Sequence, residues 1–336
     1  MLNLKKIYGS LPWLVEQRQQ LTDLVAADRC PHALLIQGAE GSGRRHLALW
    51  VASEILGMDP SRGLESDPDT EVGHPDFRAI EVLADKTRIG TDQIRALIEF
   101  INLTSYSANA KVVVIYPADT MVKNAANALL KTLEEPPANT FILLICESLV
   151  RLPATIVSRC QRIRIPPPPE QMALDWLADH TAGKDLTALL SFSGGAPLAT
   201  LALHEADFAG VANQYAADLK SLENRQVSPV VVAERWAKKP KGVEKGEEKK
   251  QLELALQWLY WRLSRRVHAG LEALAESPSG EMSGAASLQI SQIQQTLQAC
   301  FRQMAQIREL RLLIKGGINA ELNLAGLLMD WYGGLG

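Results

Sequence analysis

The chain reads ALLIQGAEGSGRR from Ala33 to Arg45. Its first residues, Ala33 to Ile36, form an apolar run typical of a buried strand, and a helical pattern follows the glycine-rich loop. The loop has the G-x-x-x-x-G-K-[ST] spacing of a phosphate-binding loop. Glycines let such a backbone wrap a phosphate chain, and the next helix presents unpaired N–H groups at its positive end. The candidate binding residues are Gly38, Gly41, Ser42, Gly43, Arg44 and Arg45.

Two residues of this loop depart from the phosphate-binding pattern. Arg44 stands where a lysine would reach the β- and γ-phosphates, and Arg45 replaces the hydroxyl that would ligate Mg²⁺. A guanidinium is bulkier than an ammonium and cannot ligate a cation. A glycine-rich turn with no nucleotide history is the alternative, but the strand–loop–helix setting favours a degenerate phosphate loop. We expect it to bind nucleotide weakly or not at all.

The acidic strand end that holds Mg²⁺ in an ATPase is also missing. The apolar run Val112 to Ile115 is followed by Tyr116 and Pro117, neither of which binds a metal or acts as a general base. Asp119 lies farther on, and we expect it to have a structural role, such as capping the following helix. Hydrolysis of ATP by this chain alone is therefore not expected.

Apolar runs alternate with helical patterns up to a run of four prolines at 166–169. Strands that alternate with helices predict a parallel sheet covered on both faces. The expected strands are Ala33–Ile36, Phe77–Val82, Val112–Tyr116, Phe141–Cys146 and Arg162–Ile165. The pattern predicts an α/β domain over 1–166, a small helical domain over 167–208 and an all-α domain over 209–336.

The last region carries helical patterns and two loop-like segments. Helices are expected over Leu252–Leu271, Ser287–Ile314 and Glu321–Tyr332, with loops at Arg235–Lys250 and Glu276–Ala285. Trp258 and Trp261 indicate a helical core or subunit interface, because no basic stripe accompanies them. The arginines that follow them are interpreted as a helix face: Arg262, Arg265 and Arg266.

Composition narrows the class of protein. The 336 residues carry a formal net charge of −3, so no global positive field draws the chain to nucleic acid. The four cysteines are widely spaced, which argues against a local zinc set or a secreted disulfide framework. No membrane span or signal peptide is recognised, so a cytoplasmic protein is expected.

Several short motifs make the chain resemble the clamp-loader subunits of bacterial DNA polymerase III, which are AAA+ proteins. The motifs are Leu11-Pro12-Trp13, Pro31-His32-Ala33, His74-Pro75-Asp76, Asn127 to Pro137 and Ser158-Arg159-Cys160. The segment Gly317 to Leu322 looks more like the delta-prime subunits than the hydrolysing gamma/tau subunits. The likeness is good to residue 166, moderate in the small helical domain, and confined mainly to the final helix beyond it.

The resemblance implies a fold and a role. A RecA-like AAA+ domain would be followed by a helical lid and a helical collar that joins a ring of five subunits. Arg159 would be an arginine finger for the ATP of a neighbouring subunit; a surface arginine paired with a carboxylate is the alternative. The implied partners are the gamma/tau ATPase subunits and the delta subunit. Sliding clamp and primed DNA would be reached through the assembly, a part of the polymerase (nucleotidyltransferase) holoenzyme.

Further departures from the family agree with a non-hydrolysing member. An apolar residue, Leu198, lies where ATPase members carry a phosphate-sensing lid arginine. The region Ala52–Asp76 lacks the four cysteines of a zinc module, so no zinc is expected. A divergent ATPase of the gamma/tau type and a nucleotide sensor without hydrolysis remain as alternatives. Glu134 and Glu135 suggest a subunit contact, and a catalytic carboxylate pair is not supported.

Overall fold

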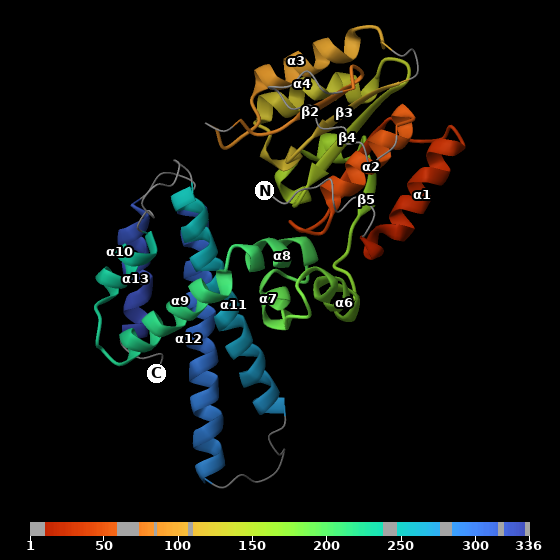
Figure 1. The fold of residues 1–336 in the computed structure, drawn as a ribbon. Coiled ribbons are helices and arrows are strands. Elements are labelled where there is room, and N and C mark those ends of the chain that lie inside the picture. Colours follow the sequence, from red (N-terminus) through yellow and green to blue (C-terminus); the bar gives the residue numbers. More distant parts are fainter. Residues whose placement is uncertain are drawn as a thin grey trace. The chain divides into compact units, whose positions relative to one another are not determined.

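The computed structural model describes residues 11–58, 74–83, 86–106, 110–237, 247–275, 284–314 and 319–332 (Figure 1). The chain separates into two compact units, 1–206 and 207–336. The helices expected to form the lid belong to the first unit. The division between the units lies close to residue 209, where the all-α region was expected to begin.

A five-stranded parallel sheet forms the centre of the first unit. Its strand order is β2-β3-β4-β1-β5, and every neighbouring pair is parallel. All five predicted strands are present, with ends that shift by one or two residues, which confirms the α/β class. The strands are β1 (Ala33–Gln37), β2 (Phe77–Ile80), β3 (Lys111–Ile115), β4 (Thr140–Cys146) and β5 (Gln161–Arg164).

Helices cover both faces of this sheet (Figure 1). Alternate residues of β1 point to opposite faces: Leu34 and Ile36 join one core, and Leu35 joins the other. The first core contains residues of α1 (Val15–Ala26) and α2 (Arg44–Leu56). The second contains residues of α3 (Thr91–Asn102), α4 (Lys123–Glu134) and the short α5 (Ala154–Val157). Strands buried on both faces explain the uninterrupted apolar runs of the sequence.

A small helical subdomain completes the first unit. It comprises α6 (Glu170–His180), α7 (Thr187–Phe192) and α8 (Pro197–Glu205), and α8 begins with a proline, whose fixed φ suits a first helical turn. Trp176 of α6 packs edge-on against Trp13 with 5.3 Å between ring centroids. Trp13 lies in the short helix η2 (Pro12–Leu14), so the subdomain shares the core of α1 and α2.

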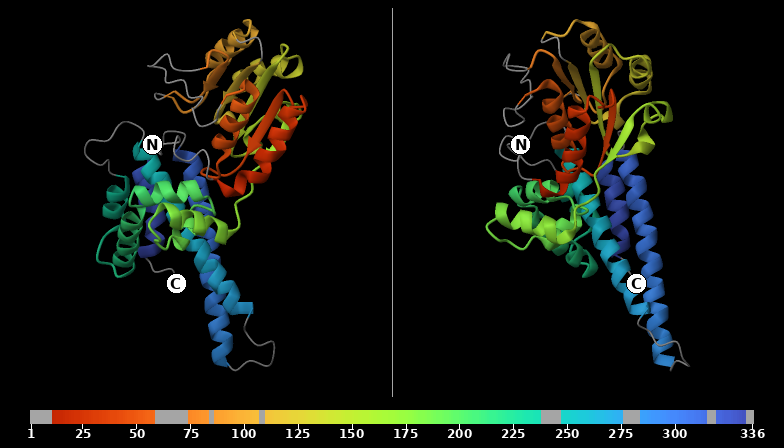
Figure 2. Two further views of the ribbon diagram at one scale, coloured as in Figure 1. Left: turned by 45° about the vertical axis from the view of Figure 1, so that its right-hand side comes forward. Right: turned by 90° about the vertical axis from the view of Figure 1, so that its right-hand side faces the viewer.

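The second unit contains helices and no strand among its described residues. They are α9 (Phe208–Glu223), α10 (Pro229–Ala237), α11 (Glu247–Ala275), α12 (Gly284–Ile314) and α13 (Ala320–Tyr332). The long helices α11 and α12 lie side by side (Figure 2). Arg308 of α12 donates to the hydroxyl of Tyr260 on α11 at 2.6 Å. Asn319 caps α13, because its side-chain oxygen accepts the N–H of Leu322 at 3.1 Å.

A buried aspartate organises the core of the second unit. Asp218 is 3% exposed and accepts hydrogen bonds from Trp236 Nε1 at 2.8 Å, from Gln214 and from Arg235. The ring centroid of Tyr215 lies 4.5 Å from that of Trp236 and 5.5 Å from that of Trp258. The rings of Trp236 and Trp258 also contact each other. Trp258 is therefore a core residue of this unit, as the sequence indicated.

Some predicted segments lie outside the described residues. They include most of the region expected to lack zinc (59–73), the middle of the mixed-charge segment (238–246), most of the second loop (276–283) and residues 317–318. The ends of the mixed-charge segment are helical rather than loop, because residues 235–237 belong to α10 and residues 247–250 to α11. The described parts of the chain contain no helix that is both long and apolar enough to span a membrane.

His46, in the first turns of α2, should make the stability of the first unit depend on pH. Burial and the charges of Arg18 and Arg45 lower the pKa of His46 to about 4. Below the ordinary pKa of 6.5, His46 is protonated in the unfolded chain but stays neutral in the folded chain. The free energy of unfolding therefore decreases as the pH falls. Between about pH 7 and about pH 5 we expect a loss of about 2 kcal/mol.

Urea unfolding across this pH range measures the effect. His46→Leu should flatten the pH slope of the first unit, whereas His268→Gln, at an exposed helical histidine, should leave it unchanged. An unaltered slope in His46→Leu would show that another group causes the dependence.

Asp218→Ala should destabilise the second unit by about 3 kcal/mol, because Arg235 and Trp236 lose a shared buried acceptor. Thermal unfolding followed by tryptophan fluorescence would measure this loss. The control is Asp330→Ala, at an exposed aspartate of α13, which should change stability by less than about 0.5 kcal/mol. Equal melting of the two variants would contradict a structural role for Asp218.

Candidate phosphate loop and arginine site

The loop between β1 and α2 has the backbone shape that its glycines predict. Gly41 and Gly43 adopt positive φ values of 78° and 90°, which glycine tolerates and other residues rarely do. Gly43 is the residue before α2. The indole Nε1 of Trp13 donates to the carbonyl of Ser42 at 2.8 Å and so fixes the loop from the side of η2. The Ser42 hydroxyl is buried and has no hydrogen-bond partner among the described residues.

Arg44 is turned inward and engaged by the loop itself. Its Nη1 donates to the carbonyl of Gly38 at 2.8 Å, and the residue is 5% exposed. Its guanidinium also lies 5.5 Å from the ring centroid of Tyr116, a cation–π contact. Arg44 of the altered phosphate loop thus contacts Tyr116 of the altered strand end, the two places at which the sequence departs from an ATPase.

Arg45 contacts residues that follow the neighbouring strands β2 and β3. It forms an ion pair with Glu81 at 2.7 Å, and its guanidinium lies 5.6 Å from the ring centroid of Tyr116. The ring of Tyr116 is therefore flanked by two arginines. Both guanidiniums are committed to protein groups within the first unit.

The residues after β3 have a structural arrangement. Asp119 is 6% exposed and accepts the N–H groups of Glu147 and Ser148 at 3.5 and 3.4 Å, with Arg151 at 3.5 Å. The expected helix cap is wrong, because α4 has no side-chain cap and Asp119 instead holds the turn after β4. The cause is the short helix η4 (Ala118–Thr120), which directs Asp119 toward that neighbouring strand end.

Helix α8 packs directly on the loop. The N–H of Leu198 donates to the carbonyl of Gly41 at 3.1 Å. A Cβ atom placed on Gly41 would lie 2.3 Å from the backbone nitrogen of Ala199, so only glycine fits there. Leu198, at the place of the expected phosphate-sensing arginine, is 6% exposed and part of the core.

These residues do not fit a magnesium nucleotide. Tyr116 and Pro117 offer no carboxylate at the strand end, and Arg45 offers no hydroxyl. Within the described ranges no group of three or more histidines, cysteines and acidic residues could hold a metal ion. His74 accepts the N–H of Asp76 at 3.1 Å, as expected of a turn residue.

Arg159 lies in the turn between α5 and β5, and is contacted by α4 and α5. Its Nε donates to Glu134 Oε1 at 2.7 Å, and its Nη2 forms an ion pair with the same oxygen. Its Nη1 donates to the carbonyl of Thr155 at 2.9 Å. The side chain remains 34% exposed. The carboxylate partner named as the alternative is thus present, and the sequence pointed to no particular residue for it.

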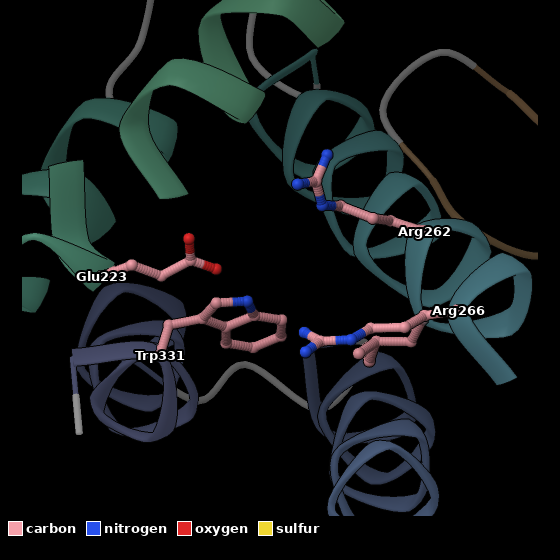
Figure 3. Close-up of a pocket in the computed structure, with 5 residues that line it drawn as sticks. Glu223, Arg262, Arg266 and Trp331 are labelled. Atoms are coloured by element: carbon pink, nitrogen blue, oxygen red, sulfur yellow. The ribbon is translucent and has the colours of Figure 1, made fainter. Parts of the chain in front are cut away.

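A second region with arginines lies in the all-α unit. Glu223 of α9, Arg262 and Arg266 of α11, and Trp331 of α13 line a cavity of about 290 Å³ (Figure 3). Arg262 also lies 5.5 Å from the ring centroid of Trp258. The expected helix face therefore has two arginines that border a cavity, and no sequence pattern indicated Glu223 or Trp331 as their neighbours.

The comparisons with known proteins agree on one family. A family model described as "DNA polymerase III, delta subunit" matches residues 15–169. The DNA polymerase III subunit delta' of Pseudomonas aeruginosa is 35% identical over 239 residues, which are 68% of this chain and 72% of that protein. Its Escherichia coli counterpart is 38% identical over 207 residues, or 58% of this chain and 61% of that protein.

Two more distant likenesses accompany these. A DNA polymerase III subunit tau of Salmonella typhimurium is 29% identical over 161 residues, 45% of this chain and 25% of that protein. A solved gamma-subunit-related protein of Thermotoga maritima covers 95% of this chain and 100% of its own, with 17% identity and a TM-score of 0.46, which is too low to support a conclusion. The alignment with most of the Pseudomonas protein, together with the match across the α/β domain, identifies this chain as a member of the delta' subunit family of DNA polymerase III.

Proposed function

We propose that this chain is a non-hydrolysing clamp-loader subunit that presents Arg159 to ATP bound by a neighbouring subunit. The observation that carries the proposal is a contrast between Arg159 and Arg44, the residue at the place of the phosphate-binding lysine. Arg44 is 5% exposed and bonded to its own loop, whereas the Arg159 side chain is 34% exposed beyond its ion pair. A planar cation stabilises the charge that collects on the γ-phosphoryl oxygens during transfer.

The lack of hydrolysis rests on the groups at the loop. Hydrolysis needs a metal, a group that orients water and a free cation at the phosphates. Tyr116 and Pro117 stand where the acidic strand end would be, and Arg44 donates to Gly38. Weak or absent nucleotide binding is supported by the engagement of Arg44 with Gly38 and of Arg45 with Glu81.

The ion pair with Glu134 is compatible with presentation to a neighbour. Exposed pairs contribute about 0–1 kcal/mol, because water screens them. The pair occupies one edge of the guanidinium, so the phosphate oxygens of a neighbour's ATP would bind its other N–H groups.

The proposed partners follow from family membership. They are the gamma/tau and delta subunits of a cytoplasmic clamp loader, with the sliding clamp and primed DNA reached through the assembly. The match to a tau subunit supports a shared architecture with the ATP-hydrolysing members. The chain would serve as a scaffold within the polymerase holoenzyme.

The isolated chain should show no Mg²⁺-dependent ATP turnover and no micromolar nucleotide binding. Steady-state ATPase assays and equilibrium dialysis with labelled ATP measure these two properties, with the gamma/tau subunit as positive control. Turnover would favour a divergent ATPase, and micromolar binding without turnover would favour a nucleotide sensor. Either result would contradict the scaffold that we propose.

Arg159→Ala should lower the DNA-stimulated ATPase rate of the reconstituted loader. Loss of an arginine finger slows its own site by about a thousandfold or more, and other sites would keep part of the total rate. Assembly with gamma/tau and delta, measured by gel filtration, should be unchanged. Arg164→Ala, at an exposed arginine of β5, is the matched control. Full activity of the Arg159 variant would remove the finger role.

A further inference from the structure

The Arg159 guanidinium is anchored along one edge. Glu134 Oε1 accepts from both Nε, at 2.7 Å, and Nη2, and the Thr155 carbonyl accepts from Nη1 at 2.9 Å. Nη1 also lies 3.5 Å from the Ser158 hydroxyl. A guanidinium carries five N–H donors, of which the contacts with Glu134 and Thr155 use three. The side chain is 34% exposed, so its outer part remains accessible to a further acceptor.

Glu134 stands at the last turn of α4, where a carboxylate on its own is unfavourable. The carboxyl end of a helix carries partial negative charge, which repels an acidic side chain. The cation of Arg159 offsets this repulsion. The next residue, Glu135, has the same charge, and the described residues show no contact between it and Arg159.

The position of Glu134 is fixed by the rest of the first unit. The adjacent Leu133 is 1% exposed in the core between α4 and the sheet. A ring nitrogen of His32, just before β1, lies 3.0 Å from the Leu133 carbonyl. The end of α4 that carries Glu134 is therefore held by the residue before β1, the strand that leads into the phosphate loop.

We infer that Glu134 is a positioning residue for Arg159, an inference that rests on the proposed function. A free arginine side chain samples many rotamers, and presenting one of them to a neighbour's ATP costs conformational entropy. The two contacts with Glu134 and the one with Thr155 restrict those rotamers before ATP arrives. A preoriented cation stabilises developing charge without reorganising during the reaction.

The inference distinguishes a positioning carboxylate from a restraining one. A restraining carboxylate would hold Arg159 away from ATP, so its removal would raise activity. Removal of a positioning carboxylate would instead lower activity. Glutamine at position 134 keeps an oxygen that accepts from Nε, whereas alanine removes the anchor altogether.

The test uses the reconstituted loader with sliding clamp, primed DNA and ATP. The readout is the Arg159-dependent part of kcat, the difference between the unmodified loader and the loader with Arg159→Ala. Glu134→Ala should lower this part about fivefold, with little change in the KM for ATP, because the nucleotide is bound by the neighbour. Glu134→Gln should keep at least about half of it, and Glu99→Ala, at an exposed glutamate of α3, should keep all of it.

A double variant tests the coupling between the two residues. Glu134→Ala added to Arg159→Ala should cause no further loss, because a positioning residue acts only through the residue that it positions. Thermal unfolding and co-elution with gamma/tau and delta confirm that each variant folds and assembles.

Unchanged or raised kcat in Glu134→Ala, while Arg159→Ala is impaired, would overturn the inference and leave the finger role in place. A further loss in the double variant would also overturn it. Full activity of Arg159→Ala would overturn both proposals, so the two failures are distinguishable.

Discussion

Close backbone packing around the loop between β1 and α2 is the constraint on which the first unit depends. A Cβ on Gly41 would lie 2.3 Å from the backbone nitrogen of Ala199, and one on Gly43 would lie 2.9 Å from the side-chain Cδ1 of Leu14. Both glycines also have positive φ values. The loop therefore brings together η2, α2 and α8. The glycine spacing has a structural reason in this chain that does not depend on a bound phosphate, because only glycine allows these elements to approach so closely.

This packing separates the shape of the loop from its chemistry. The backbone keeps the strand–loop–helix form, while the side chains beside it have become partners of one another. Arg44 bonds to Gly38, Arg45 pairs with Glu81, and both flank Tyr116. Asp119 likewise accepts the N–H groups of Glu147 and Ser148 in the turn after β4. Charged groups at this edge thus stabilise the unit, and Arg159 lies apart from them in the turn between α5 and β5.

The second unit relies on a different kind of constraint. Its described helices enclose an aromatic cluster of Tyr215, Trp236 and Trp258, and the indole of Trp236 donates to buried Asp218. A buried carboxylate requires such donors, because an unpaired charge in a core is strongly destabilising. The bonds to Asp218 therefore link α9 to α10 at a definite register, and this unit can form its core from helices alone.

The strands, the loop and the family motifs could be predicted from the sequence, because each depends on residues adjacent in the chain. Apolar runs such as Val112 to Ile115 report burial on both faces of a strand wherever that strand lies. The pairs of side chains that contact one another became known only from the folded chain. Glu134 and Arg159 are 25 residues apart, and Asp119 and Glu147 are 28 apart. Local periodicity carries no information on such pairs, since folding of the whole sheet sets their distances. The same reason explains why the cap expected for Asp119 was wrong, whereas the loss of an acidic strand end at Tyr116 and Pro117 could be read directly.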